Sequence, residues 1–345
     1  MMRLISSGSK GSGFRGSCLG VAGNAVALAA LAACLGFLPN VAAAQATAQP
    51  TRQQPAVRRS AGAPAGQQTF SSAAEASTAL ITALRSDDQQ ALSKMLGPDA
   101  KDILSSGDET EDKNDRDQFI QKYEQMHRMV TEPDGTTTLY IGAENWPTPI
   151  PLVHAGNSWY FNTAAGKQEI LYRRIGENEL AVIQVCRELV DAEKEYYAQP
   201  HDGDSGKQYA QKFFSDPQMH NGLYWETVPG QVESPIGSLV ASAAIEGYIK
   251  DASQKPQPFQ GYYFRIVKGQ GASAAGGERS YLVGGKMTRG FAIVAYPAEY
   301  RSSGVMTFVV NQDGIVYEMD LGRQTDEIAK GLTRYDRDSS WRKSD

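Results

Sequence analysis

The hydrophobic positions of residues 70–129 recur with the spacing of α-helices. After Ser71 and Ser72, which can cap a helix, apolar residues follow at three- and four-residue intervals, at positions 76, 79, 80, 83 and 84. The same spacing predicts a second helix over residues 88–96, a short helical turn over residues 99–105 and a helix over residues 116–129. The charged run that starts at Gly107 is expected to be the loop leading into the last of these helices.

Beyond residue 134 the pattern changes from helical to alternating. Strands are expected over residues 136–141, 150–154 and 158–161, with turns at residues 134–135 and 155–157. A long helix is expected over residues 178–198, followed by strands over residues 261–268, 290–296, 305–311 and 315–320. Shorter helices are expected over residues 208–214 and 238–248, and the Gly-, Ala- and Ser-rich residues 269–285 are expected to form a loop.

This order of elements predicts an α+β fold in which helices pack on antiparallel sheets. Two sheet-bearing regions are expected: an α+β domain over residues 69–177, and a long helix with an antiparallel sheet over residues 178–345. A chain of 345 residues that is 41% hydrophobic is large and apolar enough for two such domains.

Residues 1–44 have the pattern of an export signal. Arg3, Lys10 and Arg15 precede an apolar run over residues 19–38, and the small residues that follow suit cleavage after Ala44 or Ala46. An alternative is a lipoprotein signal, because Leu31-Ala-Ala-Cys34 fits a lipobox in which Cys34 is lipidated. Residues 45–68, rich in Gln, Ala, Pro and Arg, are predicted to be a disordered linker. We therefore expect a periplasmic or secreted bacterial protein, or one anchored through Cys34, with no membrane-spanning helix after cleavage.

Charge and cysteine content narrow the function classes. The net charge is −5 and the body of the chain has no large basic block, which argues against nucleic-acid binding. Of the three cysteines only Cys186 follows the export segment, so neither an internal disulfide nor a cysteine-based metal site is expected. The Gly-rich residues 269–277 are not followed by Gly-Lys-Ser/Thr, so we expect no cofactor held by a phosphate-binding loop.

Few residues are placed for catalysis or metal binding. None of the four histidines has a partner at metal-ligand spacing. Tyr123 and His127 on the predicted helix, with a carboxylate such as Glu124 or Asp117, are the acid/base candidates. Asp202 and Asp204 are candidate calcium ligands, although the ligand pattern of a calcium loop stops after them. The binding candidates are aromatic residues suited to stacking on sugars or peptides, namely Trp146, Trp159, Tyr224 and Trp225.

Several sequence blocks resemble an uncharacterised family of exported bacterial proteins, the domain of unknown function 2950. They include Trp146-Pro-Thr-Pro-Ile-Pro-Leu-Val, Gly156-Asn-Ser-Trp-Tyr-Phe and Gly290-Phe-Ala-Ile-Val-Ala-Tyr-Pro, and the resemblance covers residues 68–342. It implies no activity. The element order of residues 70–175 is also similar to the cone-shaped fold of the nuclear-transport-factor-two superfamily, and residues 180–322 are similar in shape to the globular region of type II secretion pseudopilins.

Two functional hypotheses follow. The first is an exported, non-enzymatic protein that binds an envelope protein or a cell-wall polymer. The alternative is a small-molecule enzyme that uses a pocket in the N-terminal cone, with Tyr123, His127 and Glu124 as acid/base side chains. The alternative requires these side chains to converge within hydrogen-bonding distance inside a concave site.

Overall fold

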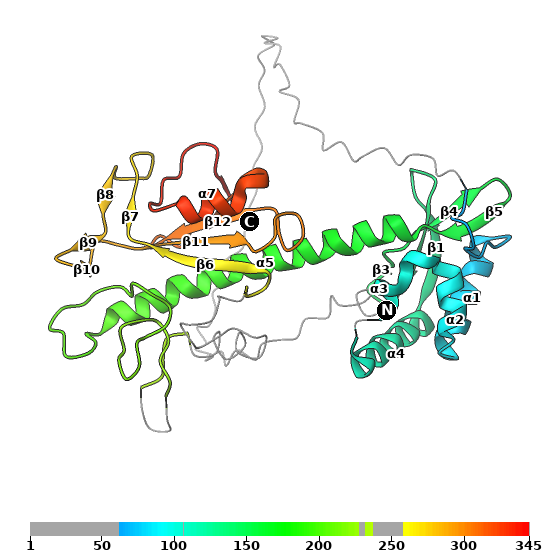
Figure 1. The fold of residues 1–345 in the computed structure, drawn as a ribbon, viewed down its shortest axis with the longest axis horizontal. Helices are drawn as coiled ribbons and strands as arrows, with labels where there is room; N and C mark the ends of the chain where they lie inside the picture. The colour runs from blue at the N-terminus through cyan, green and yellow to red at the C-terminus, as the bar shows by residue number, and fades with distance from the viewer. Residues whose placement is uncertain (1–61, 106, 228–231, 237–257, 345) are drawn as a thin grey trace, which may run out of the picture. The chain divides into compact units, whose positions relative to one another are not determined.

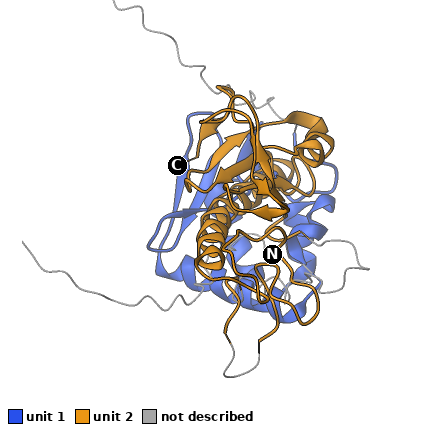
Figure 2. Ribbon diagram, turned by 90° about the vertical axis from the view of Figure 1, so that its left-hand side faces the viewer, with its two compact units in different colours: residues 1–163 blue, residues 164–345 orange. Residues whose placement is uncertain are grey.

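The computed structural model describes residues 62–105, 107–227, 232–236 and 258–344. The predicted signal peptide, Cys34, most of the predicted linker and the helix expected over residues 238–248 lie outside the described residues. The chain divides into two compact units, residues 1–163 and residues 164–345, which are coloured separately in Figure 2.

The helices described in unit 1 are α1 (Ala73–Arg85), α2 (Gln89–Leu96), α3 (Lys101–Leu104) and α4 (Glu109–Gln125), as Figure 1 shows. Three of them, α1, α2 and α4, begin at side-chain caps. The Ser72 hydroxyl accepts the N–H of Glu75, and the Asp88 carboxylate accepts the N–H of Ala91. These caps are encoded locally, and the predicted helices over α1 and α2 are confirmed.

Helix α4 starts and ends earlier than its sequence pattern predicts. Asp108 accepts the N–H groups of Thr110 and Glu111, so the charged run is helical from Glu109 onward. Its acidic first turn suits the positive end of the helix dipole. Residues 127–129, expected to be helical, instead belong to strand β1 (His127–Thr131), because this segment pairs along its full length with β2 (Thr137–Ile141).

The sheet of unit 1 is antiparallel with the order β1-β2-β4-β5. Its other strands are β3 (Trp146–Pro147), which pairs with β2, β4 (Leu152–Ala155) and β5 (Ser158–Phe161). Helices α1 and α2 lie next to β5, and α4 lies next to β2. The buried residues Leu139, Ile141 and Leu152 of the sheet and Phe119 of α4 belong to the core of this unit.

The folded part of unit 1 includes the last residues of the predicted linker. The buried Gln67 amide donates to the carbonyl oxygens of Met95 at 2.8 Å and Phe161 at 2.7 Å, which ties the start of the fold to α2 and β5. Phe70 then forms a two-way backbone bridge with Trp159. These partners lie far along the chain, so the composition of residues 45–68 could not predict them.

Unit 2 is built on the long helix α5 (Thr163–Ala198), which starts fifteen residues before its predicted start at residue 178 (178 − 163 = 15). Gly166 and Gly176 interrupt the first half of the helix, and each Gly lowers helix propensity by about 1 kcal/mol relative to Ala. Tertiary hydrogen bonds support this half, because Arg174 donates to the carbonyl of Ser302 at 3.0 Å and Asn178 to that of Ser303 at 2.8 Å.

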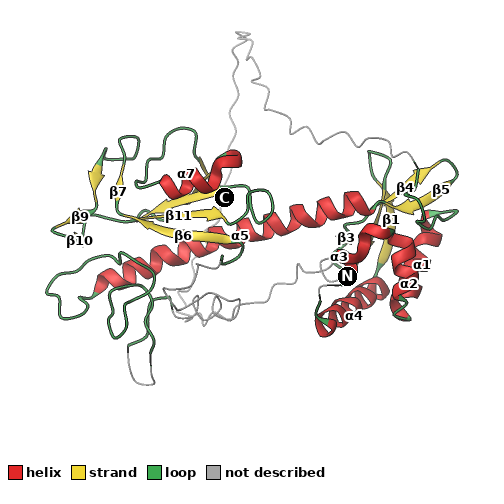
Figure 3. Ribbon diagram, viewed as in Figure 1, coloured by secondary structure: helices red, strands yellow, loops and turns green. Residues whose placement is uncertain are grey.

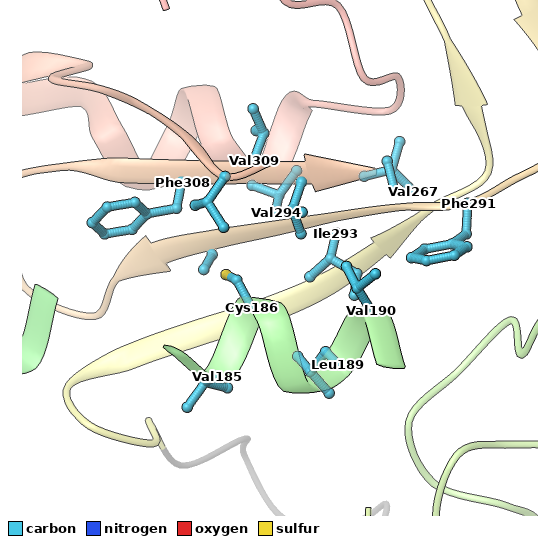
Figure 4. Close-up of a cluster of buried hydrophobic side chains, with 14 of the residues drawn as sticks. Val185, Cys186, Leu189, Val190, Val267, Phe291, Ile293, Val294, Phe308 and Val309 are labelled. Atoms are coloured by element: carbon cyan, nitrogen blue, oxygen red, sulfur yellow. The ribbon is translucent and has the colours of Figure 1, made fainter. Parts of the chain in front are cut away.

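An antiparallel sheet with the order β14-β13-β12-β11-β6 packs on α5. Its strands are β6 (Tyr262–Val267), β11 (Ala292–Pro297), β12 (Thr307–Asn311), β13 (Tyr317–Met319) and β14 (Arg342–Lys343). Helix α7 (Thr325–Gly331) lies against the face that points away from α5 (Figures 1 and 3). Figure 4 shows Cys186 and Val190 of α5 facing Ile293 and Phe308 of the sheet, and all four are buried.

The other described segments of unit 2 are short or irregular. Two small pairs of strands form in or next to the predicted loop over residues 269–285. They are β7 (Gly269–Gln270) with β8 (Arg279–Ser280), and β9 (Leu282–Val283) with β10 (Lys286–Met287), which follows the end of that loop. The helix expected over residues 208–214 does not form, because the backbone N–H of Tyr209 donates to Met287 at 2.8 Å and that of Ala210 to a carboxylate of α5.

The predicted α+β fold, with helices on antiparallel sheets in two regions, is confirmed. None of the helices in the described part of the chain combines the length and the apolarity that a membrane crossing needs.

Candidate functional site

The structure brings Tyr123 and His127 together but directs the candidate carboxylates elsewhere. The two rings stack with centroids 3.9 Å apart and planes 9° apart, and Nδ1 of His127 lies 2.9 Å from the carbonyl oxygen of Tyr123. The Tyr123 hydroxyl points to Ser77 of α1, 3.3 Å away. Glu124 forms an exposed ion pair with Arg85 at 2.8 Å. The stacked rings therefore connect the end of α4 to the start of β1.

Asp117, the other candidate carboxylate, pairs with Lys113 on the same helix at 2.7 Å. The hydrogen bond from Lys113 lowers the pKa of Asp117. A general base that works near neutral pH needs its pKa moved in the opposite direction. Asp117 therefore has the environment of a surface ion pair.

Trp146 and Trp159 are half-buried residues of the first sheet. Trp146 lies on β3 opposite Ile141, and Trp159 lies on β5 opposite His154. The rings of Trp159 and the exposed His154 are 5.0 Å apart, centroid to centroid. Both tryptophan side chains are therefore partly exposed, and their rings can stack on a ligand.

A shallow groove of about 490 Å³ lies between α1 and α2, where the sequence pattern predicts no site. Its lining includes Ala79, Ala83 and Ala91, small side chains that let a ligand approach the helix backbones. Thr78, Thr82 and Ser86, one helical turn apart along α1, also line it. The signal in the sequence is this i, i+4, i+8 row of hydroxyl residues.

Each of the three hydroxyls in this row donates a hydrogen bond to a backbone carbonyl of the preceding turn. Thr78 donates to the carbonyl of Ala74 at 3.0 Å, Thr82 to that of Thr78 at 2.7 Å, and Ser86 to that of Thr82 at 3.0 Å. Each hydroxyl oxygen keeps lone pairs with which it can accept a hydrogen bond. The groove therefore presents a row of acceptors beside an apolar floor.

The aromatic candidates of unit 2 are involved in packing. Trp225 is only 6% exposed, and its indole N–H donates to the carbonyl of Val232 at 3.1 Å. Its ring is close to those of His220 and His201, with centroids 4.5 and 5.8 Å away. The ring of Tyr224 meets that of Phe214 edge to face at 5.9 Å. Trp225 is thus an interior residue of this unit.

Asp202 and Asp204 each bind groups of the protein. The Asp202 carboxylate accepts the backbone N–H of His220 at 2.9 and 3.0 Å. Asp204 pairs with Lys286 of β10, and this hydrogen bond lowers the pKa of Asp204. Within the described residues no cluster of three or more His, Cys, Asp or Glu could hold a metal ion. The Lys286 ammonium supplies the positive charge that a calcium ion would bring to Asp204.

Glu193 on α5 is a buried carboxyl that the sequence pattern did not single out. Its side chain is fully buried, and its Oε2 accepts the backbone N–H of Ala210 at 2.8 Å. Its Oε1 is also buried and has no hydrogen-bond partner among the described residues. Burial raises the pKa of Glu193 well above its ordinary value. The signal was present, since Glu193 continues the buried stripe of Val182, Cys186 and Leu189 at helical spacing.

Comparison with known proteins identifies the family of this chain. The model of the family described as "Protein of unknown function (DUF2950)" matches residues 67–344, so the chain belongs to that family, as the sequence blocks predicted. The match starts at Gln67, the residue at which the fold is tied to α2 and β5. No curated protein and no solved structure matches the chain. The two likenesses in shape, to the nuclear-transport-factor-two cone and to the pseudopilin globular region, stay predictions.

Proposed function

We propose that this protein is an exported, non-enzymatic binding module of the cell envelope, and that the groove between α1 and α2 is its recognition site. The ligand that the groove fits best is a cell-wall polymer. Export is supported by the signal pattern of residues 1–44 and the linker composition of residues 45–68. The groove supplies the site.

The row of hydroxyl oxygens along α1 is the observation that carries this proposal. Residues four apart on a helix are about 6 Å apart along the axis, so Thr78, Thr82 and Ser86 place three acceptors in a line. The neighbouring Ala79, Ala83 and Ala91 have small side chains, which leave room for a polymer chain to lie along this line. A polymer that repeats amide N–H or hydroxyl donors matches such a row, whereas a compact ligand would use one position of it.

The geometry of the acid/base candidates favours binding over catalysis. Glu124 and Asp117 are held by Arg85 and Lys113 on the surface. The Tyr123 hydroxyl is directed at Ser77 in the helical layer. An enzyme using this region would have to break these contacts before a carboxylate reached His127.

Co-sedimentation of residues 45–345 with purified peptidoglycan tests the proposal. Ala79→Leu places a larger side chain in the groove, while Ala74→Leu changes an exposed residue of α1 that does not line it. We expect Ala79→Leu to weaken binding at least about tenfold, a loss of about 1.4 kcal/mol, and Ala74→Leu to bind like the unaltered chain.

Two outcomes would contradict the proposal. One is that the unaltered chain does not sediment with the polymer. The other is that Ala79→Leu and Ala74→Leu bind equally well. If groove variants instead lose a crosslink to one envelope protein in intact cells, the ligand is that protein and the polymer assignment is wrong.

A further inference from the structure

Residues 199–225, called here the wrapping segment, cover the C-terminal end of α5 without forming a helix or an extended strand. Their attachment depends on a few specific contacts. The Tyr196 hydroxyl donates to the carbonyl of His220 at 2.8 Å. The His201 ring stacks on that of Tyr196 at 3.9 Å, and its Nε2 lies 2.9 Å from the carbonyl oxygen of Tyr196.

Glu193 makes the most deeply buried of these contacts. Its Oε2 accepts the N–H of Ala210 in the middle of the segment, and its Oε1 is enclosed with no partner among the described residues. The Tyr209 ring, next to Ala210, stacks on Tyr197 of α5 at 4.4 Å and lies 4.9 Å from Phe291. These ring contacts hold the segment next to Ala210 against α5 and Phe291.

No positive charge is paired with Glu193 among the described residues. The titratable and charged groups around it are Tyr196 and Tyr197 of α5, Tyr209, His201, Asp202, Asp204 and His220 of the wrapping segment, and Lys286 of β10. The ammonium of Lys286 is held by Asp204. Ionisation of Glu193 would therefore leave a buried charge without a counter-ion, which is strongly unfavourable.

We propose that Glu193 is a proton-operated latch: its neutral carboxyl holds the wrapping segment on α5, and loss of its proton releases the segment while the sheet stays folded. The proton leaves from the carboxyl to solvent as the segment opens, and the resulting carboxylate becomes hydrated. Release exposes Tyr209 and the end of α5. The inference does not depend on the α1–α2 groove, which lies in unit 1.

The direction of the pH dependence follows from linkage. The folded protein binds the Glu193 proton more tightly than the open form, because burial raises the pKa of this carboxyl in the folded state. The closed segment is therefore most stable at or below the ordinary glutamate pKa and becomes less stable as pH rises above it. Other charged and titratable groups lie in the same segment, so the test isolates Glu193 by substitution.

Hydrogen exchange of residues 45–345, followed by mass spectrometry and corrected for intrinsic rates, tests the latch. We expect protection of peptides covering residues 207–213 to fall at least about tenfold between about pH 5 and about pH 9, while β11 and β12 stay protected. Glu193→Gln keeps an acceptor for Ala210 but cannot ionise, so protection of its segment should not change with pH. Glu195→Gln, an exposed neighbour on α5, should behave like the unaltered chain.

A segment with pH-independent protection in the unaltered chain would overturn the latch. So would a Glu193→Gln protein that keeps the full pH dependence. Glu193→Met, neutral and of similar length, repeats the test if the Gln variant leaves β11 and β12 unprotected. Persistence of the pH dependence in that variant would assign it to another group.

Discussion

The carboxylate of Glu179, on α5, accepts the backbone N–H of Val305 at 2.8 Å. The same oxygen accepts the N–H of Met306 at 2.9 Å, so one helical side chain holds the chain where it enters β12. The hydroxyl of the buried Tyr262 completes this junction by donating to the carbonyl of Met306 at 2.9 Å. The connection between β11 and β12 is thus tied to the helix through charge-assisted hydrogen bonds, which are stronger than neutral ones.

Replacing Glu179 by Ala should destabilise unit 2. Two N–H groups lose their charged acceptor, and hydrogen bonds to charged groups contribute about 1.5–3 kcal/mol each in favourable cases. We expect a loss of at least about 3 kcal/mol in the free energy of unfolding, measured with urea. Glu179→Gln keeps an acceptor and should lose less. Equal stability of the Ala variant and a Glu195→Ala control would show that this junction contributes little.

Replacing Glu193 by Gln should raise stability at alkaline pH and flatten its pH dependence. The pKa of Glu193 is raised in the folded state, so the unaltered chain loses stability as pH increases above the ordinary glutamate pKa. One proton sets a limit of about 1.4 kcal/mol per pH unit on this slope. Urea unfolding of both proteins between about pH 5 and about pH 9 measures the difference. Parallel curves for the two proteins would mean that Glu193 does not control the slope.

Cys186 should be inert while the protein is folded. It is fully buried, and burial raises the pKa of its thiol to about 12, so almost no thiolate is present near neutral pH. Iodoacetamide should leave Cys186 of residues 45–345 unmodified in buffer and label it completely in denaturant, as intact mass spectrometry would show. Rapid labelling in buffer, with β11 and β12 still protected from exchange, would contradict its place in the core.

Arg265 should stabilise the C-terminal end of α7. Its guanidinium donates to the carbonyls of Ala329 at 3.0 Å, Lys330 at 2.5 Å and Leu332 at 2.9 Å, where the helix has unsatisfied acceptors and a negative dipole end. Arg265→Ala should cost about 1–2 kcal/mol and expose the amides of α7 to exchange. Arg265→Lys keeps the charge but not the fork of donors, so we expect an intermediate loss. Unchanged exchange in both variants would rule out this capping role.

Local chemistry explains which elements could be predicted from the sequence. Helices α1 and α2 begin at Ser72 and Asp88, whose side chains cap neighbouring N–H groups. Strands β5 and β12 carry alternating or continuous runs of aromatic and β-branched residues, and they form where predicted. Strand β1 could not be predicted in this way, because its conformation depends on pairing with β2.

The candidate groove could be predicted only in part from the sequence, because it depends on which helices pack together. The hydroxyls of Thr78, Thr82 and Ser86 share a face by helical spacing alone, but the groove exists only where α2 packs beside α1. Two of the aromatic candidates are the same residue type in different surroundings: Trp159 is half-buried on the sheet, and Trp225 is buried and packs beside His220. Residue type alone could not distinguish them.

By itself, the sequence determined the α+β class, the family and the identity of most helices and strands, because caps, turns and hydrophobic periodicity act over a few residues. The tertiary structure alone decided the hydrogen-bond partner of Glu193 and the ion-pair partner of Asp204. Glu193 meets Ala210 17 residues along the chain, and Asp204 meets Lys286 82 residues along it. Such partners depend on which distant segments the fold brings together, and no local pattern specifies that.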